Sequence, residues 1–137
     1  MAEAIEVEVV AADGVAWEGQ AHSIIVRTTE GDVGIWPSHE PFLAAVVPCA
    51  VEIIRVDGVH DVVAVDGGFV SVADNRVSIL AQYARIAREI DVEAARREFA
   101  LAEKAMNEGR VNDEIVRDYH RAAAQVKAAE RAVGVER

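Results

Sequence analysis

The spacing of the apolar residues changes near residue 88, and this change limits the chain to two structural parts in series. Before that point apolar and polar residues alternate, as at Ile5, Val7 and Val9, which is typical of strands with one buried face. After it there is no proline, and apolar residues recur every three or four positions, as in amphipathic helices. The sequence therefore predicts a β domain at residues 1–88 and a helical domain at residues 89–137.

Turn-forming residue pairs divide the β part into short segments at a spacing of roughly eight residues. Among these pairs are Asp13-Gly14, Asp57-Gly58 and Asp74-Asn75, which are favoured in tight turns. Val15–Ala21 and Ser23–Thr28 are predicted as two separate strands. The whole pattern predicts about ten antiparallel strands, arranged as a β-sandwich or a flattened barrel.

Two apolar stripes in the helical part predict an antiparallel α-helical hairpin. Asp91 is the expected N-cap of the first helix, Gly109 its left-handed end, and Asn112 or Asp113 the cap of the second. The first stripe comprises Val92, Ala95, Phe99, Ala102 and Met106, and the second Ile115, Tyr119, Ala122, Val126, Ala129 and Val133. Burial of one CH₂ group stabilises by only about 0.8 kcal/mol, and alanine side chains bury little apolar area. A hairpin with alanines at its seam is therefore marginally stable alone, so it must either dock on the sandwich or detach easily.

Composition excludes several classes of function. The net charge of −10 argues against binding nucleic acid through a basic patch. No apolar run approaches the roughly 20 residues that span a bilayer, and the acidic N-terminus is unlike a signal peptide, which together point to the cytoplasm. The single cysteine, Cys49, is interpreted as a small core residue rather than a reactive thiol.

The second helix carries the main basic surface of the chain, namely Arg117, Arg121, Lys127 and Arg131. Residues 1–88 contain 13 acidic and 5 basic side chains, whereas residues 89–137 contain 11 and 9. Two interpretations stay open for the basic residues. They form either a solvated face with intrahelical ion pairs or a surface that meets an acidic partner.

No catalytic motif or metal-ligand spacing is present, and no cofactor is expected. His39 is the one histidine in a specified turn, and it is more simply a contact or bracing residue than a general base. Glu30 and Asp32 are near each other, but two carboxylates alone bind Ca²⁺ weakly. The residues by themselves therefore predict an interaction protein, with an enzyme as the least favoured alternative.

Residues 30–43, which read EGDVGIWPSHEPFL, predict a short strand at Val33–Trp36 that enters a rigid display loop before the next strand at Phe42. Pro37 and Pro41 each fix φ and remove a backbone donor, while Gly31 and Gly34 permit conformations that a side chain obstructs. This stretch resembles the epsilon subunit of the bacterial F-type ATP synthase. So do AVDGGFVSV at residues 64–72, RVSILA at residues 76–81 and EID at residues 89–91, in the same order along nearly the whole chain.

The resemblance implies a ten-stranded β-sandwich followed by a helical hairpin, and a non-catalytic place in the central stalk. It implies binding to the gamma subunit and the c-ring, coupling of proton flow to ATP synthesis, and inhibition of ATP hydrolysis by the hairpin. The catalytic alpha and beta subunits would be partners when the hairpin extends. The implied location is peripheral, at the cytoplasmic face of the bacterial cell membrane, with membrane contact only through the complex.

Several residue roles follow from the resemblance alone. Glu30 and Asp32 match the loop that meets the c-ring, and His39 matches a gamma contact. The regulatory helix would carry Arg117, Arg121, Lys127 and Arg131. Some members bind ATP, for which Asp91, Lys127 and Arg131 are the matching positions here.

The chain also departs from the family pattern. Ala94 replaces the arginine of the ATP motif and so removes a guanidinium fork for phosphate. Ser38 and Glu40 stand where glycine and alanine are usual, so a backbone conformation different from that of the usual glycine is expected at Ser38. The alternative function is an acidic β-sandwich adaptor unrelated to ATP synthase.

Overall fold

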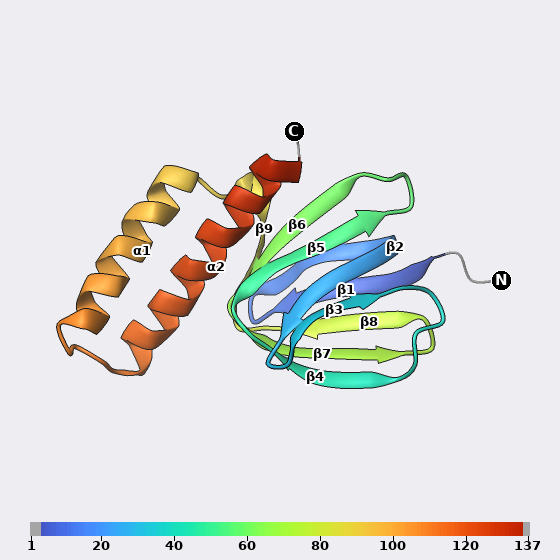
Figure 1. The fold of residues 1–137 in the computed structure, drawn as a ribbon, viewed down its shortest axis with the longest axis horizontal. Coiled ribbons are helices and arrows are strands. Elements are labelled where there is room, and N and C mark those ends of the chain that lie inside the picture. The colour runs from blue at the N-terminus through green and yellow to red at the C-terminus, as the bar shows by residue number, and fades with distance from the viewer. Residues whose placement is uncertain (1–3, 136–137) are drawn as a thin grey trace.

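The strands of the first part and the two helices of the second form one assembled structure (Figure 1). The computed structural model describes residues 4–135, with side chains to residue 132. Its strands are β1 (Ile5–Ala11), β2 (Gly14–Thr28), β3 (Gly31–Ile35), β4 (Phe42–Val46), β5 (Cys49–Arg55), β6 (His60–Val65), β7 (Gly68–Ala73), β8 (Arg76–Leu80) and β9 (Ala84–Ile86). A short 3-10 helix (Ala87–Glu89) leads into α1 (Val92–Asn107) and α2 (Asp113–Val135).

The strands form a sandwich because β2 passes from one layer to the other. Its first half pairs with β1, and its second half pairs with β3 and β5. The register shifts between Ala21 and Ser23, which is the mark of a bulge that bends a strand. One layer continues as β1-β8-β7-β4 and the other as β3-β2-β5-β6-β9.

Alternate side chains of both layers fill the space between them. Valine and isoleucine dominate this core, and Val9, Ile24, Ile53 and Val77 are each 0% exposed. The alternation that predicted half-buried strands is visible in β1, where inward and outward residues take turns. Branched aliphatic side chains suit a pleated surface, so a core poor in aromatic residues still packs.

The predicted sandwich and helical hairpin are confirmed, with two differences. Val15–Ala21 and Ser23–Thr28, predicted as separate strands, are one bent strand, and residues 4–135 contain nine strands, which agrees with the expected number of about ten. The pairing of β1 with β8 is parallel, whereas only antiparallel pairs were predicted. Turn signals reveal hairpins between consecutive strands, but a parallel pair depends on segments far apart in the chain.

The helix ends follow from their capping residues. The Asp91 side chain accepts a hydrogen bond from the backbone N–H of Ala94 at 3.2 Å, and the Asn112 side chain accepts one from Ile115 at 2.9 Å. Asn112 is therefore the cap of α2, which the sequence left open between two residues. Gly109 has φ +78°, the left-handed conformation predicted for it.

The two helices differ in what they contact. The first predicted stripe is confirmed, since Ala95 and Ala102 are buried, and the rings of Phe99 and Tyr119 lie 5.4 Å apart across the helix pair. α1 packs on α2, whereas α2 also packs on β5 and β6, as Figure 1 shows. Val133 of the second stripe lies outside the residues whose side chains are described.

Gly68 provides a test of how tightly β7 and β8 approach. Both Gly68 and Gly14 have φ near +140°, but a Cβ at Gly68 would overlap with the carbonyl oxygen of Leu80, whereas Gly14 faces open space. Gly14→Ala is expected to cost about 1–3 kcal/mol of unfolding free energy because of backbone strain alone. Gly68→Ala should cost a further ~2 kcal/mol or more because of the overlap. Urea unfolding of both variants measures the difference, and equal losses would contradict the close approach.

Candidate protein-binding surfaces

α2 docks on the outer face of the sandwich through alanines. Ala124 and Ala128 are 0% exposed and pack against Val62 and Ala64 of β6, together with Ala87. Neighbouring residues on β6 alternate, so Val63 and Val65 point into the core while Val62 and Ala64 meet the helix. α2 therefore has two apolar faces, and only the face toward α1 was predicted. Ala124 and Ala128 could have been found as a second stripe with four-residue spacing.

A buried acid marks one side of this contact. Glu52 of β5 is 8% exposed, and its carboxylate accepts hydrogen bonds from Nη1 of Arg131 at 3.1 Å and from Nδ1 of His60 at 2.7 Å. Burying a charge is costly unless it is paired, so Arg131 stabilises Glu52 when α2 is docked. The sequence gave no sign of this pair because the two residues are far apart along the chain.

Tyr83 marks another side of the contact. The Gln125 amide donates a hydrogen bond to the Tyr83 hydroxyl at 2.7 Å, and the Arg121 guanidinium lies 4.8 Å from the centre of the Tyr83 ring. The second interaction is a cation–π contact, which adds attraction at a partly exposed site. The apolar contact is thus flanked by polar interactions that fix the position of α2.

The basic residues of α2 consequently have a third arrangement, which neither sequence interpretation described. Arg121 and Arg131 contact the sandwich of the same chain, Lys127 faces it across a cleft, and Arg117 is exposed. The acidic partner of Arg131 in this structure is Glu52 of the chain's own β domain.

The connection between the two parts is held by Asp61. This carboxylate is 8% exposed and accepts hydrogen bonds from Nε1 of Trp17 at 2.8 Å and from Nη1 of Arg88 at 3.4 Å. Arg88 belongs to the short 3-10 helix that precedes α1. Asp61 of β6 therefore links β2 to the short 3-10 helix before α1, and the sequence analysis had not identified it.

The predicted acidic pair lies where β2 turns into β3. Glu30 and Asp32 are exposed, and Arg27 of β2 pairs with Asp32, its Nε donating to Oδ1 at 2.8 Å. The hydrogen bond from Arg27 holds the pKa of Asp32 below its ordinary value. In residues 4–135 no group of three or more histidine, cysteine or acidic side chains is placed to bind a metal.

A cleft of about 460 Å³ separates this turn from α2. Its walls include Arg27 and Asp32 from the turn, Glu52 from β5, and Lys127 and Arg131 from α2. Cys49 lines the bottom and is 4% exposed, and burial raises the pKa of its thiol, as expected for an unreactive core cysteine. The cleft brings together residues that the sequence had assigned to separate roles.

The candidate ATP residues do not all line one cleft in this structure. Asp91 caps α1 and does not line the cleft that holds Lys127 and Arg131, while Arg131 is paired with Glu52. Ala94 offers no phosphate ligand. ATP binding by Asp91, Lys127 and Arg131 together stays a prediction.

Contacts within the display loop hold the segment between β3 and β4 in place. Nδ1 of His39 donates to the carbonyl of Glu40 at 2.7 Å, and the ring contacts Phe42 edge-on with centroids 6.0 Å apart. Ser38 has φ +69°, so it occupies the left-handed conformation that suits glycine best. The Trp36 indole lies against Gly34, where a Cβ would overlap with it.

An apolar patch occupies part of the outer face of the layer opposite the hairpin. The strand register places Ala45, Phe69, Leu80 and Val10 in one row across β4, β7, β8 and β1, with Leu43 in the next row. Leu43 is 72% exposed, Phe69 58% and Leu80 54%. Contiguous exposed apolar side chains mark interaction sites, so this patch is the strongest candidate for a protein contact.

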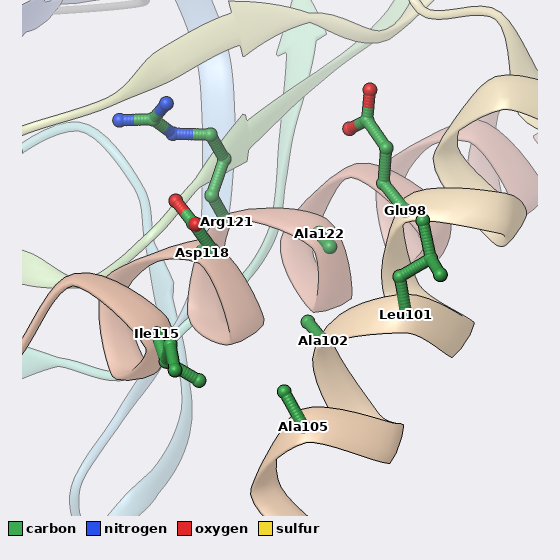
Figure 2. A pocket seen from close by; sticks show the side chains of 8 residues that line it. All are labelled: Glu98, Leu101, Ala102, Ala105, Ile115, Asp118, Arg121 and Ala122. Carbon is green, nitrogen blue, oxygen red and sulfur yellow. The ribbon is translucent and has the colours of Figure 1, made fainter. Parts of the chain in front are cut away.

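A second hollow, of about 410 Å³, lies between the two helices (Figure 2). Leu101, Ala102 and Ala105 of α1 face Ile115 and Ala122 of α2 around it, as the figure shows. The small alanines leave this space because they fill little of the gap between the helices.

No described helix is both long enough and apolar enough to cross a bilayer.

The protein is thus a β-sandwich with a docked helical hairpin. Its distinctive features are surfaces suited to contact with other proteins. Residues 4–87 match the family model described as "ATP synthase, Delta/Epsilon chain, beta-sandwich domain". The chain therefore belongs to the ATP synthase delta/epsilon chain family, as the sequence motifs predicted. This membership excludes the alternative of an adaptor unrelated to ATP synthase.

Individual relatives agree with this assignment. The chain is 47% identical over 133 residues to the ATP synthase epsilon chain of Cutibacterium acnes, covering 91% of each chain. It is 41% identical over 129 residues to that of Streptomyces coelicolor, covering 94% of this chain and 98% of the relative. A chain in the Euglena gracilis mitochondrial ATP synthase structure, described as OSCP/F1/c-ring, superposes with a TM-score of 0.73 at 26% identity, covering 97% of this chain and 83% of that one.

The alanine contact predicts a substitution that releases the hairpin. Ala128→Leu adds volume at a position that is 0% exposed, so docking of α2 should weaken by about 1–3 kcal/mol. Backbone hydrogen exchange is expected to become faster in α1 and α2, while the core strands keep their protection. Ala100→Leu, at an exposed position of α1, is the matched control. It should change neither the exchange rates of the helices nor the protection of the core strands.

Proposed function

We propose that this protein is the epsilon-type rotor subunit of an F-type ATP synthase, where it couples proton flow through the c-ring to ATP synthesis and restrains ATP hydrolysis. The observation that carries this proposal is the match of nearly the whole chain, hairpin included, to curated epsilon chains. The subunit would have no catalytic site of its own. Its work would be mechanical, through contact surfaces on one face and at one end of the sandwich.

The apolar patch is the proposed docking face for the gamma subunit. Phe69 and Leu80 are opposite each other on β7 and β8, and Leu43 lies beside them on β4. A rotor contact must carry torque, and a rigid sheet face with exposed apolar side chains supplies area without much conformational entropy cost. His39, in the braced loop after β3, is a further proposed gamma contact.

The β2–β3 turn is the proposed contact with the c-ring. Glu30 and Asp32 project from a short, glycine-containing turn at an end of the sandwich. Their negative charge suits a polar loop that carries a basic group. Association with the cytoplasmic face of the cell membrane would then be peripheral and occur only through the complex.

The two parts of the chain are proposed to act as two domains, a β-sandwich at residues 1–88 and a regulatory hairpin at residues 89–137. The small size of the alanine contact supports this division, because little apolar area is lost when α2 leaves the sheet. In the extended state Arg121 and Arg131 would give up their contacts on the sandwich, and together with Arg117 and Lys127 they would meet acidic segments of the catalytic alpha and beta subunits. The hairpin would then block hydrolysis.

An assembly experiment with two variants separates the two rotor contacts. Phe69→Asp places a charge in the apolar patch and is expected to reduce binding of purified gamma subunit at least tenfold, because a charge is poorly tolerated at a buried apolar contact. Asp32→Lys should retain gamma binding but lower proton-coupled ATP synthesis of the reconstituted enzyme. Gamma binding by Phe69→Asp at the wild-type level would contradict the patch assignment.

Removal of the hairpin tests the regulatory role. A chain that ends after Arg88 keeps every strand of the sandwich and is expected to assemble with gamma as before. ATP hydrolysis by the assembled complex should rise at least twofold relative to the full-length chain, because the inhibitory element is absent. Unchanged hydrolysis in a fully assembled complex would show that these helices do not restrain this enzyme.

A further inference from the structure

The cleft between the β2–β3 turn and α2 joins two proposed functional elements electrostatically. Across the outer face of the sheet, Asp32 is opposite Arg27, and Ile25, the next outward residue of β2, is opposite Glu52. Glu52 is therefore a diagonal neighbour of Arg27 on the same face, within reach of a long side chain. Glu52, which pairs with Arg131 of α2, and Asp32, which pairs with Arg27, thus lie on the same face of the sheet.

Charges from α2 close the other side of the cleft. Lys127, Glu130 and Arg131 line it from the helix, and Arg131 donates to Glu52 at 3.1 Å. Glu130 is shared with α1 through Arg96 at 3.6 Å. Arg27 donates twice to Asp32, at 2.8 and 3.3 Å, so its positive charge is neutralised beside the cationic side chains of the helix.

The neutralisation by Asp32 determines how the turn and the helix interact. While Asp32 holds Arg27, the turn offers Lys127 and Arg131 no net positive charge, and Asp32 itself attracts Arg131, which contributes to its lowered pKa. If the Asp32 carboxylate is taken by another cation, Arg27 becomes an unpaired charge next to two like charges. It is also then available to Glu52, which Arg131 requires for docking.

We infer that Arg27 transmits the occupancy of the β2–β3 turn to the hairpin: a partner's basic group that pairs with Asp32 turns Arg27 toward the cleft and loosens α2. The inference rests on the proposed mobility of the hairpin and adds a signal that moves it. By thermodynamic linkage the effect is reciprocal, so the docked hairpin weakens the binding of a basic group at Asp32. The β2–β3 turn, which is the proposed c-ring contact, and the regulatory hairpin are thereby coupled within one chain.

The substitution Asp32→Asn mimics a neutralised carboxylate and tests the coupling in the isolated full-length chain. Donor and acceptor dyes at Asp13→Cys on the sandwich and Glu103→Cys on α1, in a Cys49→Ala background, report the docked fraction. The ratio of docked to released molecules is expected to fall about two- to fivefold, the range for partly exposed charge networks. Asp32→Asn combined with Arg27→Gln should return the ratio to near the value of the dye-labelled parent.

Glu30→Gln is the matched control, because it removes an acid from the same turn that does not line the cleft. It is expected to leave the ratio unchanged. Where both docked and released molecules are detected, the inference is overturned if Asp32→Asn leaves their ratio unchanged, or if adding Arg27→Gln restores nothing.

A second measurement keeps this test separate from that of the proposed function. Urea unfolding followed by circular dichroism compares Asp32→Asn in the parent and in a Lys127→Gln background, whether or not the hairpin detaches. The loss of stability caused by Asp32→Asn should shrink by at least half when Lys127 is neutral. An undiminished loss overturns the coupling, whereas an absence of released molecules in the dye experiment contradicts only the mobile hairpin.

Discussion

The contact between Ala124 and Ala128 of α2 and Val62 and Ala64 of β6 is the constraint on which the arrangement of the two parts depends. Small side chains allow the helix to approach the sheet closely, but they bury little apolar area. The position of α2 is therefore set by the polar interactions at its margins, above all the pair of Arg131 with buried Glu52. Glu52 is buried whereas Arg131 is half exposed, so displacing the helix would leave the Glu52 carboxylate without this cation, which is costly for a buried charge. Such a contact defines one docked position while burying little apolar area.

The sandwich uses its two outer faces for different purposes. One face, across β5 and β6, is covered by α2, and the other, across β4, β7 and β8, presents Leu43, Phe69 and Leu80 to solvent. The strict alternation of strands makes this division possible, because each outward residue belongs to a fixed row set by the register. A single rigid core thus separates a face that binds within the chain from a face suited to a partner.

Sequence reasoning succeeded where the signal was local and failed where it depended on residues far apart. Alternation, turn pairs and capping residues such as Asp91 and Gly109 predicted the strands, the hairpin and its ends, because each of these features is determined within a few residues. The parallel pair of β1 with β8 and the contacts of Glu52 and Asp61 depend on the tertiary fold, so no local pattern indicated them. The exposed turn with Asp32 was identified, but its partner Arg27 was not.

The parallel pairing of β1 with β8 also constrains the order in which the chain can reach its native state. β1 can form a hairpin with β2 early, but its other edge stays open until residues 76–80 have left the ribosome. Closure of the core then requires bringing together segments some seventy residues apart, which makes this step slower than the local hairpins. The helices are synthesised last and meet a sandwich whose receiving strands, β5 and β6, can already have formed. Folding during synthesis thus ends with the helical part, which meets the sandwich through small side chains.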